Sequence, residues 1–336
     1  MKTALIGLGM VSGTYADAFK TSAHVQLSLV HARTQASRTQ FLDKWPELEA
    51  REAATLDDIA ASDMDFVVVT TPPNARREIV ERMCEARKPI LMEKPVERTL
   101  AAATDLVATC ARADLPLGIM LQHRARPVVA ELRALLPRLG PLRAVEVNVP
   151  WWRPQSYYDE PGRGTYARDG GGVLISQAIH TLDLMLSLTG PVREVSAMAT
   201  TTGSHQMEAE DFVTAGLRFE NGAVGQLFAT TASFPGRGET ITLHHALGSA
   251  HLEAGLLNIA WQDGRTEAIG QAARSGAGAD PMAFTSDWHR FVIEDFAAAL
   301  KDNRPPLVTG EAALEVHRLI DALETSARSG ATVAVG

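Results

Sequence analysis

A glycine-containing loop directly after the first apolar run constrains the fold of this chain most strongly. The run Ala4–Ile6 predicts a strand, and Gly7-Leu8-Gly9-Met10-Val11-Ser12 follows it, ahead of a helical pattern. This order fits the dinucleotide fingerprint G-x-G-x-x-G, with the small Ser12 in the last position. Gly7 permits the tight turn, and Gly9 lets the backbone approach a pyrophosphate at the helix N-terminus. A plain glycine turn is the alternative, and the strand-before, helix-after context favours the fingerprint.

Short apolar runs alternate with helical patterns through the first third of the chain. The β-branched run Phe66–Thr70 predicts a strand buried on both faces. Thr55, followed by acidic residues, is typical of a helix start. The alternation predicts a parallel, doubly wound α/β sheet over residues 1–121. The other predicted strands are Val25–Val30, Pro89–Met92 and Leu115–Leu121, and the other predicted helices are Gly13–Lys20, Thr34–Lys44, Ala75–Glu85 and Thr99–Arg112.

The pattern changes near Gln122, and we expect a second domain over residues 122–336. Ala144–Val149 predicts a strand, and a triple glycine precedes a predicted helix over Val173–Leu188. Antiparallel strands are expected beyond Val192, so this domain is expected to be of α+β type.

Two turns in the second domain favour hairpins. Asn221-Gly222 and Asp263-Gly264 lie between apolar runs, and type I′ turns need positive φ. Residues 270–279 are rich in glycine and alanine and predict a loop. Helical patterns over Trp288–Lys301 and Gly310–Ser329 end the chain.

Composition and charge exclude several classes of protein. The 336 residues are 46% hydrophobic and 21% charged, which excludes a disordered or collagen-like chain. The formal charge of −8 argues against a sequence-independent nucleic-acid binder, which needs a basic face. No run approaches the ~18 apolar residues that span a bilayer, so no membrane partner is expected.

The cysteines and histidines predict no metal site. Cys84 and Cys110 lack CxxC partners, so neither a disulfide framework nor a structural zinc site is expected. His244 and His245 are adjacent on a predicted strand and would point to opposite faces. The N-terminus superficially resembles a signal peptide, but glycines interrupt its apolar stretch, and we expect a cytoplasmic protein.

The end of the second predicted strand bears on cofactor choice. An NAD site usually carries an acid there, which binds the ribose 2′-hydroxyl. This chain has Val30-His31-Ala32-Arg33-Thr34 instead. Arg33 can pair with a 2′-phosphate and Thr34 can add a donor, so we expect NADP in preference to NAD. A solvated Arg33 is the alternative.

Two further motifs carry chemistry-bearing side chains. Glu93-Lys94-Pro95 follows an apolar run, and a lysine at the C-terminal end of a parallel strand points into the ligand crevice. Ser176 and His180 are four residues apart and would share a helix face. Asp183 could orient the imidazole or hold local structure. Five basic residues nearer the N-terminus are expected to form a solvated face around one helix: Arg76, Arg77, Arg82, Arg87 and Lys88.

Together these motifs resemble the Gfo/Idh/MocA oxidoreductase family, over nearly the whole chain. The glycine loop, Thr71-Pro72-Pro73-Asn74, Glu93-Lys94-Pro95, the triple glycine before Ala178-Ile179-His180, and Pro305–Gly310 occur in the family's order and spacing. The resemblance implies an N-terminal Rossmann domain and a C-terminal domain with an open, mostly antiparallel sheet. It also implies a homodimer or homotetramer formed through that sheet.

The resemblance implies roles for individual residues. Lys94 would lie near the nicotinamide and the substrate hydroxyl, and His180 would be the acid/base. Ser176 stands where many members carry aspartate, and Gln122-His123-Arg124 replaces an asparagine–arginine pattern. Expected cofactor contacts are Gly7, Gly9, Met10, Val11, Arg33, Thr34, Thr71, Pro72, Asn74, Glu93, Lys94 and Gln122. Expected substrate contacts are Lys94, Arg124, Trp152, Arg153, Tyr157, Arg163, Ser176, Gln177 and His180.

The expected function is hydride transfer between a nicotinamide and a carbinol or carbonyl carbon of a sugar, cyclitol or related polyol. The aromatic loop Trp151–Tyr158 suits such surfaces, although Trp151 and Trp152 could instead seal the domain junction. Arg153 and Arg163 keep sugar acids and cyclic dihydrodiol acids open as substrates. An NAD-dependent glycosidase that uses transient oxidation and a non-catalytic, cofactor-sensing regulator remain as alternatives.

Overall fold

Two compact units make up the computed structural model, which describes residues 1–271 and 276–336. Unit 1 contains Met1–Gln122 and Ser286–Leu314, and unit 2 contains His123–Thr285 and Glu315–Gly336. The domain boundary expected from the sequence, between residues 121 and 122, lies one residue before the end of the first segment of unit 1. The sequence did not predict that Ser286–Leu314 belongs to the same unit. The predicted loop over residues 270–279 lies partly outside the described residues.

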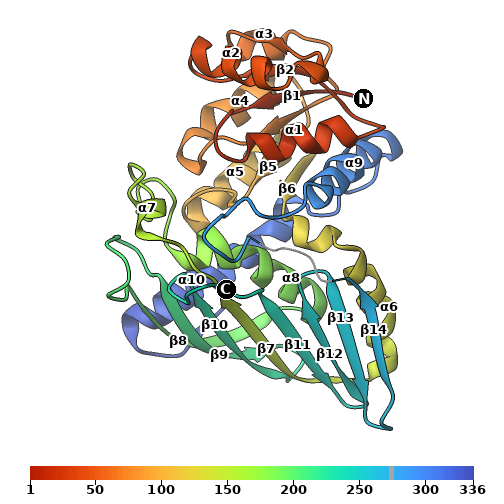
Figure 1. The fold of residues 1–336 in the computed structure, drawn as a ribbon, viewed down its shortest axis with the longest axis vertical. Coiled ribbons are helices and arrows are strands. Elements are labelled where there is room, and N and C mark those ends of the chain that lie inside the picture. The colour runs from red at the N-terminus through yellow and green to blue at the C-terminus, as the bar shows by residue number, and fades with distance from the viewer. Residues whose placement is uncertain (272–275) are drawn as a thin grey trace. The chain divides into compact units, whose positions relative to one another are not determined.

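Unit 1 is built on a six-stranded parallel sheet in the order β3-β2-β1-β4-β5-β6 (Figure 1). This confirms the predicted doubly wound sheet. Its strand order reverses beside β1, and ligands bind at such a switch point, outside the carboxyl ends of the strands. The strands are β1 Lys2–Ile6, β2 Gln26–His31, β3 Arg51–Glu52, β4 Phe66–Val69, β5 Ile90–Glu93 and β6 Leu117–Met120.

Helices of unit 1 begin where the sequence signals place them. Thr55 and Asp58 form a capping box at α3, and Thr34 and Thr99 cap α2 and α5. Helix α9 packs close to the sheet, where a Cβ at Gly118 would lie 2.7 Å from the Phe296 ring. The helices are α1 Ser12–Thr21, α2 Gln35–Lys44, η1 Pro46–Leu48, α3 Leu56–Ala60, η2 Pro73–Ala75, α4 Arg77–Glu85, α5 Leu100–Arg112 and α9 Asp287–Asp302.

Unit 2 is built on a nine-stranded sheet in the order β14-β13-β12-β11-β7-β10-β9-β8-β15. All neighbours pair antiparallel except β7 and β10, which are parallel. Both predicted hairpins are confirmed, with positive φ at Gly222 and Gly264. The strands are β7 Leu142–Pro150, β8 Val192–Thr200, β9 Phe212–Phe219, β10 Val224–Thr230, β11 Thr240–His245, β12 Gly248–Glu253, β13 Leu256–Trp261, β14 Thr266–Gly270 and β15 Val333–Ala334.

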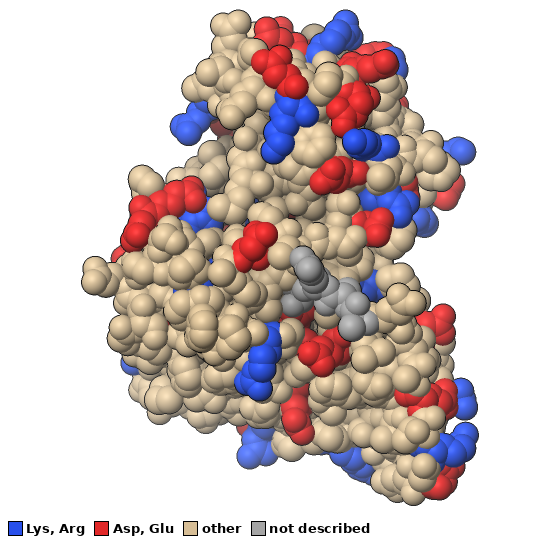
Figure 2. Space-filling view, in the orientation of Figure 1, with Lys and Arg blue, Asp and Glu red and all other residues tan. Residues whose placement is uncertain are grey.

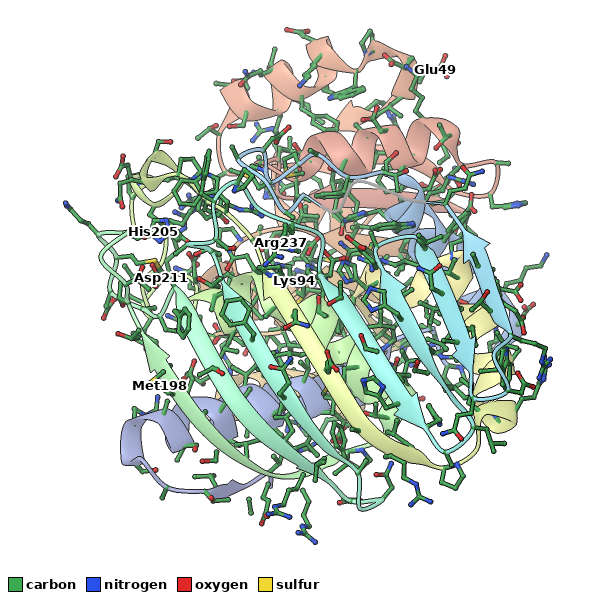
Figure 3. The ribbon with its side chains drawn as sticks, turned by 60° about the horizontal axis from the view of Figure 1, so that its bottom comes forward. Glu49, Lys94, Met198, His205, Asp211 and Arg237 are labelled. Carbon is green, nitrogen blue, oxygen red and sulfur yellow. The ribbon has the colours of Figure 1, made fainter. Side chains whose placement is uncertain are left out.

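Helices cover one face of this sheet and leave the other uncovered (Figures 1 and 3). Residues alternate along β9, with Val213, Ala215 and Leu217 buried toward the helices. Besides α9, the helices that follow β6 are η3 Gln122–Ala125, α6 Pro127–Leu139, α7 Gln155–Tyr158, the π-helix η4 Leu174–Ala178, α8 Ile179–Thr189 and α10 Gly310–Ser329. Among the described residues, no helix has the length and apolar character needed to cross a membrane.

Candidate active site

The glycine loop joins β1 to α1 at the carboxyl edge of the unit 1 sheet. Gly7 has φ +106°, and a Cβ there would lie 2.8 Å from the backbone nitrogen of Thr71, so a larger residue would collide with backbone. A Cβ at Gly9 would meet nothing within 4 Å. Ser12 Oγ donates to the Gly9 carbonyl at 2.7 Å and ties the loop to the first turn of α1. Open backbone beside a helix N-terminus fits a dinucleotide phosphate.

Arg33 and Thr34 lie exposed after β2, where no carboxylate follows the strand. Thr34 Oγ1 accepts the Ser37 N–H at 3.2 Å and caps α2. Within the described part of the chain, no hydrogen bond or ion pair occupies the Arg33 guanidinium. The residues after β4 are also accessible, because Thr71 is half-buried and Pro72 and Asn74 are exposed.

Lys94 lies half-buried immediately after β5, and its peptide bond to Pro95 is cis. The Glu93 carboxylate beside it is buried, accepting the Tyr15 hydroxyl at Oε1 (2.9 Å) and the Lys94 N–H at Oε2 (3.1 Å). Burial raises the pKa of Glu93. Figure 3 labels Lys94 among the side chains of the molecule.

His289 on α9 completes the surroundings of Glu93. Its Nε2 lies 3.8 Å from Glu93 Oε1, and its ring packs edge-on against Tyr15 at 5.4 Å between centroids. Burial, with a smaller contribution from the Lys94 charge, lowers the pKa of His289 to about 3. The imidazole is therefore neutral at neutral pH. Neither His289 nor Tyr15 could be selected from the sequence, because only the packing of α1 against α9 brings them together.

In unit 2, His180 lies on a helix with an unusual start. The helix predicted over Val173–Leu188 is present, but its first part, η4, is a π-helix, and α8 begins at Ile179. Glu210 shapes this start, accepting the Gly172 N–H and the Leu174 N–H at its carboxylate, both at 3.0 Å. A Cβ at Gly172 would lie 1.8 Å from the Glu210 carbonyl oxygen, so only glycine fits at this position. Burial raises the pKa of Glu210 to about 7.

A second histidine packs on the first. The rings of His123 and His180 lie 5.0 Å apart between centroids, and both residues are buried. Next to them, Arg124 forms a two-point pair with Asp183. Ser176 is half-buried, whereas Gln177 and Gln122 are buried. The sequence singled out Asp183 and His123 without predicting either contact.

The aromatic loop of unit 2 is held by its own arginines. Arg153 is 2% exposed, donates to the carbonyls of Trp152 (2.8 Å) and Gly278 (2.6 Å), and stacks over Trp151. Arg163 pairs with Glu160 and stacks over Tyr157 at 4.4 Å. All three predicted substrate arginines, Arg124, Arg153 and Arg163, thus have partners in the chain. Trp152 is half-buried, while Trp151 is buried.

A buried pair that sequence analysis missed joins this loop to β9. His205 Nδ1 lies 2.7 Å from Asp211 Oδ2, and His205 Nε2 lies 2.8 Å from the Arg153 carbonyl. Both side chains are labelled in Figure 3. The contacts link the loop to the sheet and give these residues a structural role. Among the described residues, no cluster of three or more His, Cys, Asp or Glu is suited to a metal ion.

A parallel sheet with a glycine loop after its first strand, and a second unit with a mostly antiparallel sheet, define the two-unit α/β fold of an NAD-binding oxidoreductase. The chain belongs to the GFO/IDH/MocA oxidoreductase family, as the sequence resemblance implied. The family's NAD-binding Rossmann fold matches residues 1–120, and its C-terminal domain matches residues 129–251. The chain is thus an enzyme that uses a nicotinamide nucleotide.

Named relatives match most or all of the chain. The D-apiose dehydrogenase of Paraburkholderia graminis is 27% identical over 349 residues, covering 99% of this chain and 89% of the relative. A myo-inositol dehydrogenase of Streptomyces leeuwenhoekii is 28% identical over 235 residues, covering 68% and 69%. The WlbA dehydrogenase of Chromobacterium violaceum, solved with NADH and UDP-GlcNAcA, has a TM-score of 0.84 and 26% identity, covering 100% and 96%.

Proposed function

We propose that the protein transfers a hydride between a nicotinamide dinucleotide and a carbinol or carbonyl carbon of a sugar, cyclitol or related polyol. The observation that carries the proposal is Lys94, half-buried after β5 in the unit whose glycine loop has open backbone at Gly9. A bound nicotinamide supplies the acceptor or donor of the hydride. Lys94 donates a hydrogen bond to the substrate oxygen and stabilises the negative charge that develops on it.

His180 is proposed to take or return the hydroxyl proton. Its ring packs against the His123 ring, and Glu210 caps the start of the helix that carries it. Ser176 and Tyr157 are half-buried in the same unit and are proposed substrate contacts. The remaining proposed substrate contacts are Arg124, Trp152, Arg153, Arg163 and Gln177.

The proposed cofactor preference is NADP. Its support is the exposed Arg33 beside the N-terminus of α2, with Thr34 and Ser37 as hydroxyl donors and no acid after β2. Titration of the protein with NADPH and NADH, followed by fluorescence, measures the preference directly. We expect tighter NADPH binding, and Arg33→Ala should weaken NADPH without weakening NADH. A strong NADH preference would overturn this part of the proposal.

We also propose a homodimer or homotetramer formed through the uncovered face of the unit 2 sheet, in a cytoplasmic protein. On that face Met198 is 57% exposed and Val224 48% exposed, which is unusual for large apolar side chains. Over β8 to β10, the face drawn in Figure 2 carries few charged side chains. Sedimentation of the wild type and of Met198→Glu tests this, because a charge there should shift the assembly toward monomer.

The substrate class is tested by a panel assayed at 340 nm with NADP and NAD separately. D-apiose and myo-inositol lead the panel because relatives over most of the chain are named for them, and UDP-GlcNAcA tests a nucleotide-sugar acid. We expect turnover with at least one free polyol and a large loss of turnover in Lys94→Ala. Hydrolysis of an aryl glycoside without net reduction would instead indicate the glycosidase chemistry.

A further inference from the structure

We propose that Arg76 is a positioning residue that holds the Glu93-Lys94-Pro95 turn, and through it Lys94, in the orientation the reaction needs. This inference rests on the proposed role of Lys94. The sequence placed Arg76 in a basic, solvated face, and this is right for the exposed Arg77 and wrong for Arg76. Arg76 is 2% exposed and is the N-cap residue of α4.

The guanidinium of Arg76 donates hydrogen bonds to backbone carbonyls of two separate segments. Nε donates to the Thr71 carbonyl at 2.9 Å, Nη1 donates to the carbonyls of Glu93 and Pro95, and Nη2 donates to the Lys94 carbonyl at 3.5 Å. Three consecutive carbonyls of the lysine turn thus face one planar cation. A guanidinium presents its donors in a fixed fork, so this set of bonds specifies an orientation and not merely a contact.

The same residue joins two segments that follow neighbouring strands. Thr71 comes after β4, and the Glu93-Lys94-Pro95 turn begins at the last residue of β5; β4 and β5 are paired in the sheet. Carbonyls beyond a strand's end have no ladder partner and must bond elsewhere when buried. Arg76 satisfies them and links the lysine turn to the segment proposed to contact the cofactor.

Arg76 keeps its positive charge, although no carboxylate among the described residues forms a hydrogen bond or an ion pair with it. Burial lowers the pKa of Arg76 to about 10, and the charges of Glu93, Tyr15 and Glu97 act in the opposite direction. The guanidinium therefore remains a cation at neutral pH. A neutral side chain of similar size would leave the four carbonyls without these donors, and unsatisfied buried carbonyls are costly.

The test compares Arg76→Met and Arg76→Lys with Arg77→Met, a neighbour on the same helix that pairs only at the surface with Glu81 and Asp105. Turnover is measured well below each variant's melting temperature, so that only folded enzyme contributes. We expect R76M to lower kcat by about 10- to 100-fold, since small displacements of a reacting group have costs of this size. R76K should recover part of the loss, because it keeps a cation but not the fork. R77M should match the wild type.

Amide hydrogen exchange gives a readout that does not need a substrate. Peptides over residues 90–99 should exchange faster in R76M than in the wild type, while peptides from unit 2 exchange equally. Unchanged exchange over 90–99 would show that Arg76 does not hold the turn and would overturn the inference.

A double-mutant cycle separates this inference from the proposed function. If Arg76 acts through Lys94, adding R76M to K94A should cost little further activity. Additive losses would overturn the positioning role while leaving the role of Lys94 intact. Wild-type turnover in K94A would instead refute the proposed function, whatever R76M does.

Discussion

Arg124 binds Asp183 through two hydrogen bonds, from Nε to Oδ2 at 2.8 Å and from Nη2 to Oδ1 at 2.5 Å. The pair joins η3 to α8, and the rings of the neighbouring residues His123 and His180 pack at a tilt of 32°. Of the two roles expected for Asp183, the contact supports holding local structure. Burial raises the pKa of Asp183, against the opposing effect of Arg124.

Breaking this pair should be costly. Asp183→Asn leaves the Arg124 charge without its partner, and removing one member of a buried pair typically costs about 3–5 kcal/mol. Because the Arg124 side chain is 12% exposed, we expect the lower end of this range. Urea unfolding measures the change, and Asp183→Leu with Arg124→Met should recover part of it. If D183N lowered the free energy of unfolding by less than about 1 kcal/mol, solvent would be compensating for the loss of the Arg124–Asp183 pair.

Gly9→Ala should separate folding from cofactor binding. A methyl group at Gly9 meets nothing within 4 Å, so the variant should melt at the wild-type temperature. If a pyrophosphate approaches this backbone, the same methyl group should weaken NADPH binding by at least about tenfold. Gly203→Ala is the matched control, because its methyl group also meets nothing within 4 Å but lies in unit 2. Wild-type NADPH affinity in G9A would refute the placement of the phosphates.

Glu210 should make folding stability depend on pH. Its pKa is about 7 in the folded protein, above the 4.5 of a glutamate side chain in the unfolded chain. Between these values the folded state binds the proton that the unfolded state has released, so stability falls as pH rises. The difference between these two pKa values corresponds to about 3 kcal/mol in total.

Urea unfolding at about pH 5 and about pH 8 checks this, with Glu210→Gln as the comparison. The stability of the wild type relative to E210Q should fall between the two pH values. A difference that stays flat, or that grows with pH, would contradict the raised pKa.

Local sequence patterns predicted the fold well because burial, capping and turn formation depend on residues close together in the sequence. The apolar run at Phe66 gave β4, Thr55 gave the cap of α3, and Asn221-Gly222 gave a hairpin. These depend on burial, capping and backbone conformation within a few residues. The family resemblance added Lys94 and His180, whose chemical roles remain proposals.

The contacts around the candidate residues could not be predicted in this way. Tyr15 and His289 meet across 274 positions of sequence, and the π-helix before His180 depends on a distant residue, Glu210. Arg76 shows the same limit, because its sequence neighbours are exposed while it is buried. Cys84 and Cys110, which lack a CxxC pattern, lie with sulfurs 3.9 Å apart. Each of these contacts depends on tertiary packing, which the hydrophobic periodicity of the sequence does not predict.

Transfer of deuterium tests the central claim most directly. The protein is incubated with NADP⁺ or NAD⁺ and with the most active polyol of the panel, deuterated at its carbinol carbons. The mass of the reduced nucleotide is then measured by mass spectrometry. Hydride transfer predicts one deuterium in the nucleotide, formed far more slowly by Lys94→Met. Reduced nucleotide without deuterium, no reduced nucleotide at all, or equal rates in the wild type and K94M would contradict the account.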